Sequence, residues 1–247
     1  MALKRIVWAA VVVGVVLVAV PGIDLVVSGW FHSQEAGFVW RRAPVAIFLH
    51  DAIQIASRVI GAALALGFLY TAVRLIRLFR LGSRQWLFLL LALVVGPGLV
   101  ANVVLKDNWG RARPAQVTQF GGQKTFSPPL VMTNQCRTNC SFVAGDPASG
   151  FFLHSFAYVV APRRRRVVLA GGIAAGLAAG LLRIGMGAHF FSDVLFAGGF
   201  MIATSALLHI LIFGRKATGA FWRDMLAPPT PSLRAAEPEP QQAASHG

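Results

Sequence analysis

The sequence has few charged residues, and acidic residues are especially scarce. Only 13% of its 247 residues are charged, against about 25% in an average soluble domain, while 56% are hydrophobic. This composition excludes an ordinary soluble domain and predicts a membrane protein. The 23 Lys and Arg residues outnumber 9 Asp and Glu residues, giving a net charge of +14. Because the basic residues cluster beside apolar runs, they indicate membrane topology and not a nucleic-acid partner.

Residues that would hold a metal or a nucleotide are also missing. The two cysteines, Cys136 and Cys140, lie in one polar stretch without a His or Cys cluster to complete a zinc site. No Walker-type phosphate loop is present. The sequence therefore predicts no metal and no cofactor. The two cysteines either form a disulfide that tightens the loop or remain free thiols.

Apolar runs of about 20 residues predict an all-α protein with six transmembrane helices in a bundle. The expected spans are 6–27, 56–76, 85–105, 147–162, 167–188 and 191–213. Part of 43–55 predicts a helix that lies on the membrane surface. We expect residues 1–226 to form one membrane-embedded domain, with its core motifs in 106–193. Residues 227–247 are rich in Pro and Glu and predict a disordered cytoplasmic tail.

Basic residues cluster at alternate ends of these spans. The clusters are Lys4 with Arg5, Arg74 with Arg77, Arg80 and Arg84, Arg163 to Arg166, and Arg215 with Lys216. Because positive residues favour the cytoplasmic side, we expect all four clusters and both termini in the cytoplasm. Residues 28–55 and the polar loop 106–146 then lie on the opposite side of the membrane.

A stripe of small residues runs along the fifth predicted helix. Gly172, Gly176 and Gly180 recur at four-residue spacing, which places them on one helical face. The pattern predicts close packing against another helix.

Polar residues at the outer ends of four predicted helices converge on the side opposite the basic clusters. They are Lys106, Arg111 and Arg113 after the third helix, Gly145 and Asp146 at the fourth, Arg183 at the fifth, and His189 and Asp193 at the sixth. Ionisable groups at membrane depth are costly and usually functional. Fixed cations can hold a phosphate, and an imidazole oriented by a carboxylate can attack phosphorus. Asp193 follows His189 by four residues, which places both on one face of a helix.

The order and spacing of these residues resemble a known family. Lys106 with Arg113-Pro114 matches K-x6-R-P, and Arg183 with His189 and Asp193 matches R-x5-H-x3-D. These patterns resemble the first and third motifs of the type 2 phosphatidic acid phosphatase superfamily.

The resemblance spans residues 56–213 and implies a metal-independent phosphatase built on a six-helix bundle. It implies that His189 is the nucleophile that becomes a phosphohistidine and that Asp193 orients it. Lys106, Arg113 and Arg183 would then bind the phosphate.

The second motif departs from the family pattern. The family has P-S-G-H where this chain has Val143-Ala144-Gly145-Asp146, and Leu182 replaces the serine that opens the third motif. Gly145 keeps the turn, and nearby N–H groups can bind phosphate at the helix start. The missing histidine is the residue assigned to protonating the leaving group.

Three interpretations of Asp146 stay open. Asp146 can be the acid itself, the leaving group can be a phosphate that needs no acid, or the site can bind lipid phosphate without turnover. A role as helix cap is compatible with the chemical roles. His154 follows Asp146 by eight residues, about 12 Å along a helix, and lies too deep to replace the acid.

The surrounding sequence resembles a subgroup that removes phosphate from lipid A or related lipids. We therefore expect lipid A or a similar glycolipid as substrate, with Arg111 also meeting the headgroup. Undecaprenyl diphosphate, phosphatidylglycerophosphate and phosphatidate are alternatives, and a non-catalytic lipid-phosphate binder or transporter is the alternative from another class. The expected location is the bacterial inner membrane, with the active site facing the periplasm. The oligomeric state stays open.

Overall fold

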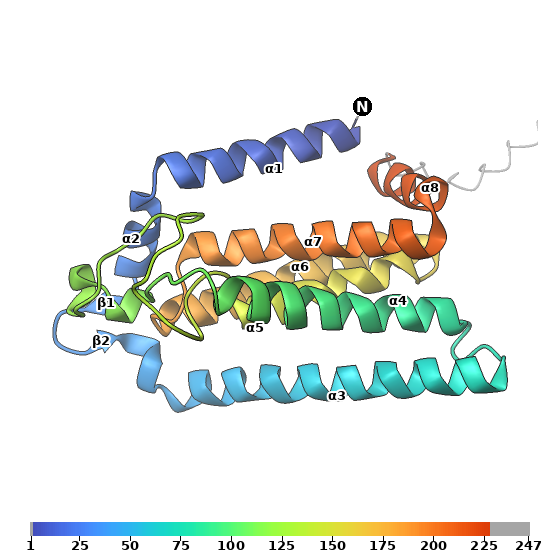
Figure 1. Cartoon of the computed structure of the whole chain (residues 1–247), viewed down its shortest axis with the longest axis horizontal. Coiled ribbons are helices and arrows are strands. Elements are labelled where there is room, and N and C mark those ends of the chain that lie inside the picture. The colour runs from blue at the N-terminus through green and yellow to red at the C-terminus, as the bar shows by residue number, and fades with distance from the viewer. Residues whose placement is uncertain (1, 228–247) are drawn as a thin grey trace, which may run out of the picture.

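The computed structural model describes the backbone of residues 2–227 and the side chains of residue 8 and residues 11–227. It is mostly helical, and its longest helices run along the long axis of the molecule (Figure 1). These are α3 (Pro44–Arg74), α4 (Ser83–Leu93) continued by the π-helical η2 (Val94–Lys106), α6 (Pro162–Gly185) and α7 (Phe191–Phe213). Each of the four is long and apolar enough to cross a membrane. The predicted tail lies outside the described residues, apart from Ala227.

The first predicted span is bent in the structure. Helix α1 (Ala2–Ala19) and helix α2 (Gly22–Gly29) meet at an angle of 84°. Pro21 lies at the bend, where it cannot donate a backbone hydrogen bond to continue the helix. The bend directs α2 toward the start of α7, where Asp24 becomes buried.

The prediction of a separate surface helix within 43–55 is wrong. These residues begin α3, which continues unbroken for 31 residues to Arg74. At 1.5 Å per residue α3 is about 46 Å long, which exceeds the apolar core of about 30 Å. The helix therefore places His50 and Gln54 beside the bundle and not on a separate surface element.

The fourth predicted span is too short to cross a membrane. It consists of α5 (Gly145–Phe152) and one 3-10 segment, η5 (Leu153–Tyr158), with a combined length of about 24 Å. Most of its side chains are buried, so its backbone is surrounded by protein, where irregular structure is tolerated. The described residues thus provide four candidate spans, or five if the bent α1–α2 pair counts as one, and not the six expected.

The glycine stripe of α6 packs as predicted against the short central segment. A Cβ atom on Gly172 would lie 2.2 Å from the His154 backbone nitrogen, and one on Gly176 would lie 2.3 Å from the Phe151 ring. At Gly180 the neighbour is Val194 of α7, at 2.3 Å. The small residues let α6 approach closely enough to bury α5 and η5.

The two ends of the bundle differ in character. One end carries α2, a hairpin of β1 (His32–Ser33) and β2 (Gly37–Phe38), and the short 3-10 segments η1 (Val39–Arg42), η3 (Pro114–Gln116) and η4 (Thr118–Phe120); we call it the loop end (Figure 1). The other end carries α8 (Arg215–Leu226) and the α3–α4 connection. Three predicted basic clusters belong to this second end, and the side chains of the Lys4–Arg5 cluster lie outside the described part.

Gly172→Ala should destabilise the protein, because the new methyl group would collide with the His154 backbone. Overpacking of this kind costs about 1–3 kcal/mol. Gly171→Ala is the matched control, since its Cβ would meet nothing within 4 Å and both changes add the same helix propensity. Thermal unfolding in detergent should show a lower midpoint for Gly172→Ala only. Equal midpoints for the two variants would contradict the packing described here.

Candidate active site

Backbone hydrogen bonds hold the three sequence motifs together at the loop end. They run from Cys140 N to Lys106 O (3.1 Å), from Ser141 N to Arg111 O (2.9 Å), from Ala115 N to Gly187 O (3.0 Å) and from Ala144 N to Asp193 O (3.4 Å). Each motif is thus joined to another by main-chain contacts. These main-chain contacts alone bring the predicted site residues close together.

His189 lies in a tight turn between α6 and α7. Gly187 adopts φ +64°, a conformation that favours glycine, and the Ala188 N–H returns to Arg183 O at 3.0 Å. The imidazole is 1% exposed, and its Nδ1 lies 2.7 Å from Ser141 O. Because a carbonyl oxygen only accepts, Nδ1 carries the hydrogen. The lone pair of the neutral ring is therefore on Nε2.

Asp193 orients His189 less directly than its spacing predicts. His189 precedes α7, so the two residues do not share a helical face, and Nδ1 lies 3.9 Å from Asp193 Oδ2. Instead Asp193 Oδ2 accepts from the Ser141 hydroxyl at 2.5 Å and from the Phe190 N–H at 2.8 Å. Asp193 thereby fixes Ser141, whose carbonyl oxygen fixes the imidazole.

The structure corrects the predicted role of Arg111 in substrate binding. Its side chain is fully buried, and its guanidinium donates to Asp193 Oδ1 (2.5 Å) and Asp24 Oδ2 (2.7 Å). It also donates to Ser192 Oγ and Ser127 O, both at 2.9 Å. These contacts direct the guanidinium into the protein, so the structure does not place Arg111 against a substrate.

Asp24 is a site residue that the sequence analysis missed. It is 1% exposed, and besides pairing with Arg111 it accepts from the Ser192 N–H at 2.8 Å at the first turn of α7. A lone carboxylate in an otherwise apolar run was the available signal, because intramembrane charges are usually paired or functional. We call Asp24, Arg111 and Asp193 the buried ion-pair network.

Three cations surround the imidazole. The positive charges of Lys106, Arg113 and Arg183 all act on His189, and together with its burial they lower its pKa well below the usual value. Burial is the main cause, and the Ser141 hydrogen bond opposes it. Burial and the nearby Arg183 also lower the pKa of Arg113, although an arginine remains charged. The site thus combines a neutral imidazole with three positive charges.

The disulfide of Cys136 and Cys140 shapes the loop that holds Arg113. The two cysteines are bonded, with Cα atoms 5.6 Å apart. Within this loop Asn139 O accepts from Arg113 Nη2 at 2.7 Å, and the Asn139 N–H donates to Asp107 Oδ1 at 2.9 Å. The disulfide alternative of the sequence analysis is therefore confirmed. Among the side chains of residue 8 and residues 11–227, no group of three or more His, Cys, Asp or Glu is placed to hold a metal ion.

Gly145 allows close approach at the start of α5. A Cβ atom there would lie 2.7 Å from Asn102 Oδ1 and 3.2 Å from Lys106 Nζ. The absent side chain therefore leaves room for the Lys106 amine beside the helix start.

Asp146 bridges helices and does not cap α5. Its Oδ2 lies 2.6 Å from His50 Nδ1 and 3.3 Å from Arg183 Nε, and Gln54 Nε2 donates to its Oδ1. The N-cap position belongs to Ala144, which makes no side-chain cap bond. The predicted capping role is wrong because the carboxylate points to α3 and α6.

His50 and Gln54 are the second feature that the sequence analysis missed. With Ala46 they lie at four-residue spacing on one face of α3, and Ala46 is buried. Two polar residues on an inward face of an apolar helix were the available signal. The prediction of a surface helix within 43–55 obscured this signal, because polar residues are expected on such a helix.

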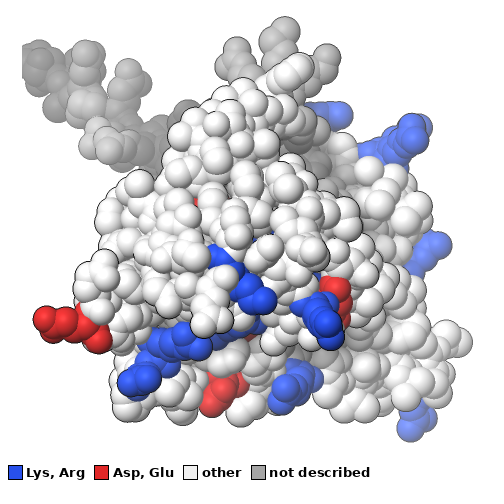
Figure 2. Space-filling model, turned by 60° about the vertical axis from the view of Figure 1, so that its left-hand side comes forward, with Lys and Arg blue, Asp and Glu red and all other residues white. Residues whose placement is uncertain are grey.

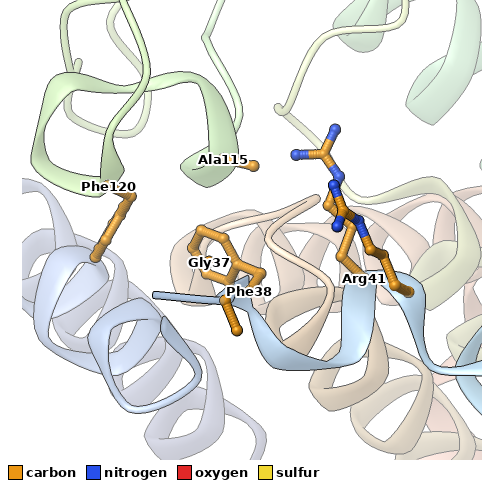
Figure 3. Close-up of a pocket in the computed structure, with 7 residues that line it drawn as sticks. Gly37, Phe38, Arg41, Ala115 and Phe120 are labelled. Carbon is orange, nitrogen blue, oxygen red and sulfur yellow. The ribbon is translucent and has the colours of Figure 1, made fainter. Parts of the chain in front are cut away.

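An open pocket of about 380 Å³ adjoins the cations at the loop end. It is lined by Ala36, Gly37, Phe38, Arg41, Arg42, Ala115 and Phe120. Figure 3 shows Phe120 and Arg41 on opposite sides of Phe38, with Ala115 close by. Arg41 is near enough for its charge to act on Arg113. Figure 2 turns this end toward the viewer and shows Lys and Arg side chains gathered across the face, with few acidic ones.

The sequence matches the PAP2 superfamily over residues 85–217, slightly more than half of the chain. The chain belongs to the PAP2 superfamily. The match covers His189, Asp193, Asp146 and the three cations, whereas Asp24 and His50 lie before it.

Three bacterial proteins are similar in sequence, and each is named lipid A 4'-phosphatase. The protein of Francisella tularensis subsp. novicida is 37% identical over 202 residues, which cover 79% of this chain and 89% of that protein. Those of Rhizobium leguminosarum and Rhizobium etli are each 40% identical, over 41% and 42% of this chain and 44% and 40% of their own lengths. No solved structure gives a significant match. With the apolar helices, these similarities identify the chain as a multi-pass membrane lipid phosphatase.

Asp24→Asn should destabilise the protein and lower its phosphatase activity. The change removes one carboxylate from a fully buried arginine, and breaking a buried ion pair costs about 3–5 kcal/mol. Thermal unfolding in detergent and phosphate release should both report the loss. Glu35→Gln, at an exposed position of the loop end, removes the same charge and should change neither. An unaltered melting midpoint in Asp24→Asn would show that the network contributes little.

Proposed function

We propose that this protein removes a phosphate group from lipid A or a similar glycolipid through a phosphohistidine on His189. The observation that carries the proposal is the fixed imidazole beside three cations. Ser141 O holds Nδ1–H at 2.7 Å, so the free lone pair on Nε2 is available to attack phosphorus. A buried, neutral imidazole is ready for this attack at neutral pH.

The cations supply the electrostatic part of the reaction. Phosphoryl transfer spreads negative charge over the equatorial oxygens, and fixed positive groups stabilise it. Arg113 and Arg183 can bind two oxygens each in a fork, while Lys106 acts as a point charge. Gly145 supports this role because a side chain there would crowd the Lys106 amine. Asp146 lies on the same side of the site as these cations, because it contacts Arg183.

We further propose that the loop end faces the periplasm across a bacterial inner membrane. The disulfide supports this orientation, because disulfides persist in oxidising compartments. The basic clusters at the opposite end also support it, since positive residues favour the cytoplasm. The substrate phosphate would then belong to a lipid of the outward-facing leaflet.

Two observations favour a large phosphorylated headgroup. The similar proteins from Francisella and Rhizobium are named for lipid A. The pocket beside Arg113 contains two further arginines and two aromatic rings, a lining suited to a sugar headgroup that carries a second anionic group.

His189→Asn should abolish phosphate release from lipid A, because the amide cannot form the phosphorylated intermediate. Purified wild-type protein quenched in base should carry a phosphoryl group on His189 that mass spectrometry can map. His189→Asn should carry none while retaining a wild-type melting midpoint. Phosphate release by this variant at the wild-type rate would refute the proposed nucleophile. Testing undecaprenyl diphosphate, phosphatidylglycerophosphate and phosphatidate in parallel would decide among the substrate alternatives.

Replacing both Arg41 and Arg42 by Ala should weaken binding of a glycolipid with two phosphates more than that of one with a single phosphate. Loss of one charge-assisted contact of about 1.5 kcal/mol corresponds to a roughly tenfold higher KM. Lys124→Ala removes a positive charge from an exposed site in the 106–146 loop and serves as the control. Equal effects of the double variant on both lipids would exclude this pocket as a second anion site.

A further inference from the structure

We propose that His50 of α3 is the proton donor for the leaving group, held in place by Asp146. The inference rests on the proposed function and adds a catalytic residue to it. In the family pattern a histidine of the second motif is assigned this task, and here Asp146 occupies its position. The structure places an imidazole in direct contact with that carboxylate, from a helix that lies before the family match.

The contacts of Asp146 occupy both of its carboxylate oxygens. Its Oδ1 accepts a hydrogen bond from the Gln54 amide, and its Oδ2 faces the Arg183 guanidinium at 3.3 Å. Neither oxygen is therefore free to face a leaving oxygen, so Asp146 itself is poorly placed to protonate an alkoxide.

The same contacts orient His50 for proton transfer. With Asp146 ionised, Nδ1 of His50 is the donor in the 2.6 Å bond to Oδ2, which leaves Nε2 for the substrate. A carboxylate that holds one imidazole nitrogen while the other transfers a proton is a recurring catalytic pair. Because Asp146 Oδ2 also contacts Arg183, the imidazole lies beside one of the phosphate-binding cations.

The exposure of the two side chains matches this division of roles. The Asp146 side chain is 5% exposed and the His50 side chain 28%. The carboxylate is therefore enclosed, whereas part of the imidazole remains accessible to a headgroup. Histidine is also the side chain that most often transfers a proton in enzyme active sites.

The proposed steps conserve atoms and charge. In the first step the lone pair of His189 Nε2 forms an N–P bond, the P–O bond to the headgroup breaks, and the proton on His50 Nε2 moves to the leaving oxygen. In the second step water attacks phosphorus, the N–P bond breaks, and His50 Nε2 takes the proton from water. The products are the dephosphorylated lipid and inorganic phosphate, with His50 protonated again.

The test compares two substrates that differ in their need for a proton. His50→Gln should lower phosphate release from lipid A by about 10²- to 10⁴-fold, the usual effect of losing a general acid. With 4-nitrophenyl phosphate, whose leaving group needs no proton, release of 4-nitrophenolate in the first turnover should stay close to wild type. The phosphohistidine should then accumulate in the variant, because the base for the second step is also missing.

Two controls separate this role from folding and from the proposed function. Asp51→Asn, at the next and exposed position of α3, should leave both reactions unchanged. His189→Asn should abolish both reactions. A wild-type protein that releases no phosphate from lipid A would instead reject the proposed function itself. His50 is not the proton donor if His50→Gln slows the first-turnover release of the dephosphorylated lipid and of 4-nitrophenolate equally, or slows neither. In that case the phosphatase assignment still stands.

Discussion

The site depends on the burial of a single positive charge. Arg111 has no exposed surface, and an unpaired charge in such a position would be severely destabilising. Its neutralisation requires Asp24 from α2 and Asp193 from α7, so two distant segments must meet around it. The 84° bend at Pro21 allows this meeting, because it directs α2 toward the start of α7 and brings Asp24 to Arg111.

The position of His189, the proposed nucleophile, follows from that pairing. Arg111 holds one oxygen of Asp193, and the other oxygen accepts from the Ser141 hydroxyl and from the N–H of Phe190, which directly precedes α7. Ser141 then presents its carbonyl to His189 and sets the tautomer of the ring. A buried ion pair contributes little net stability by itself, but here it determines the position of the His189 imidazole through two further hydrogen bonds.

Local spacing was sufficient to predict the motifs but not their partners. The Lys106–Arg113 and Arg183–His189–Asp193 patterns, the glycine stripe of α6 and the choice of apolar helices could be read from the sequence, because each depends on residues close together in the chain. Asp24 and His50 could not be assigned, since their roles arise from contacts with residues 87 and 96 positions away. For the same reason Arg111 appeared to be a phosphate ligand, because its position within the first motif does not reveal that its guanidinium is directed inward.

The exchange of histidine for Asp146 changes where a leaving group must lie. If the proton donor were on α5, the leaving group would lie in the buried centre of the bundle. If His50 is the donor, as proposed, the leaving group lies beside α3, where the neighbouring Val45 and Phe48 are 68% and 69% exposed. Displacement at phosphorus places the nucleophile and the leaving oxygen roughly in line. If His189 attacks as proposed, the phosphate would lie among the cations and the leaving oxygen would point toward α3. The apolar side chains beside His50 are then the surface on which the rest of a membrane lipid can remain within the bilayer while its headgroup reacts.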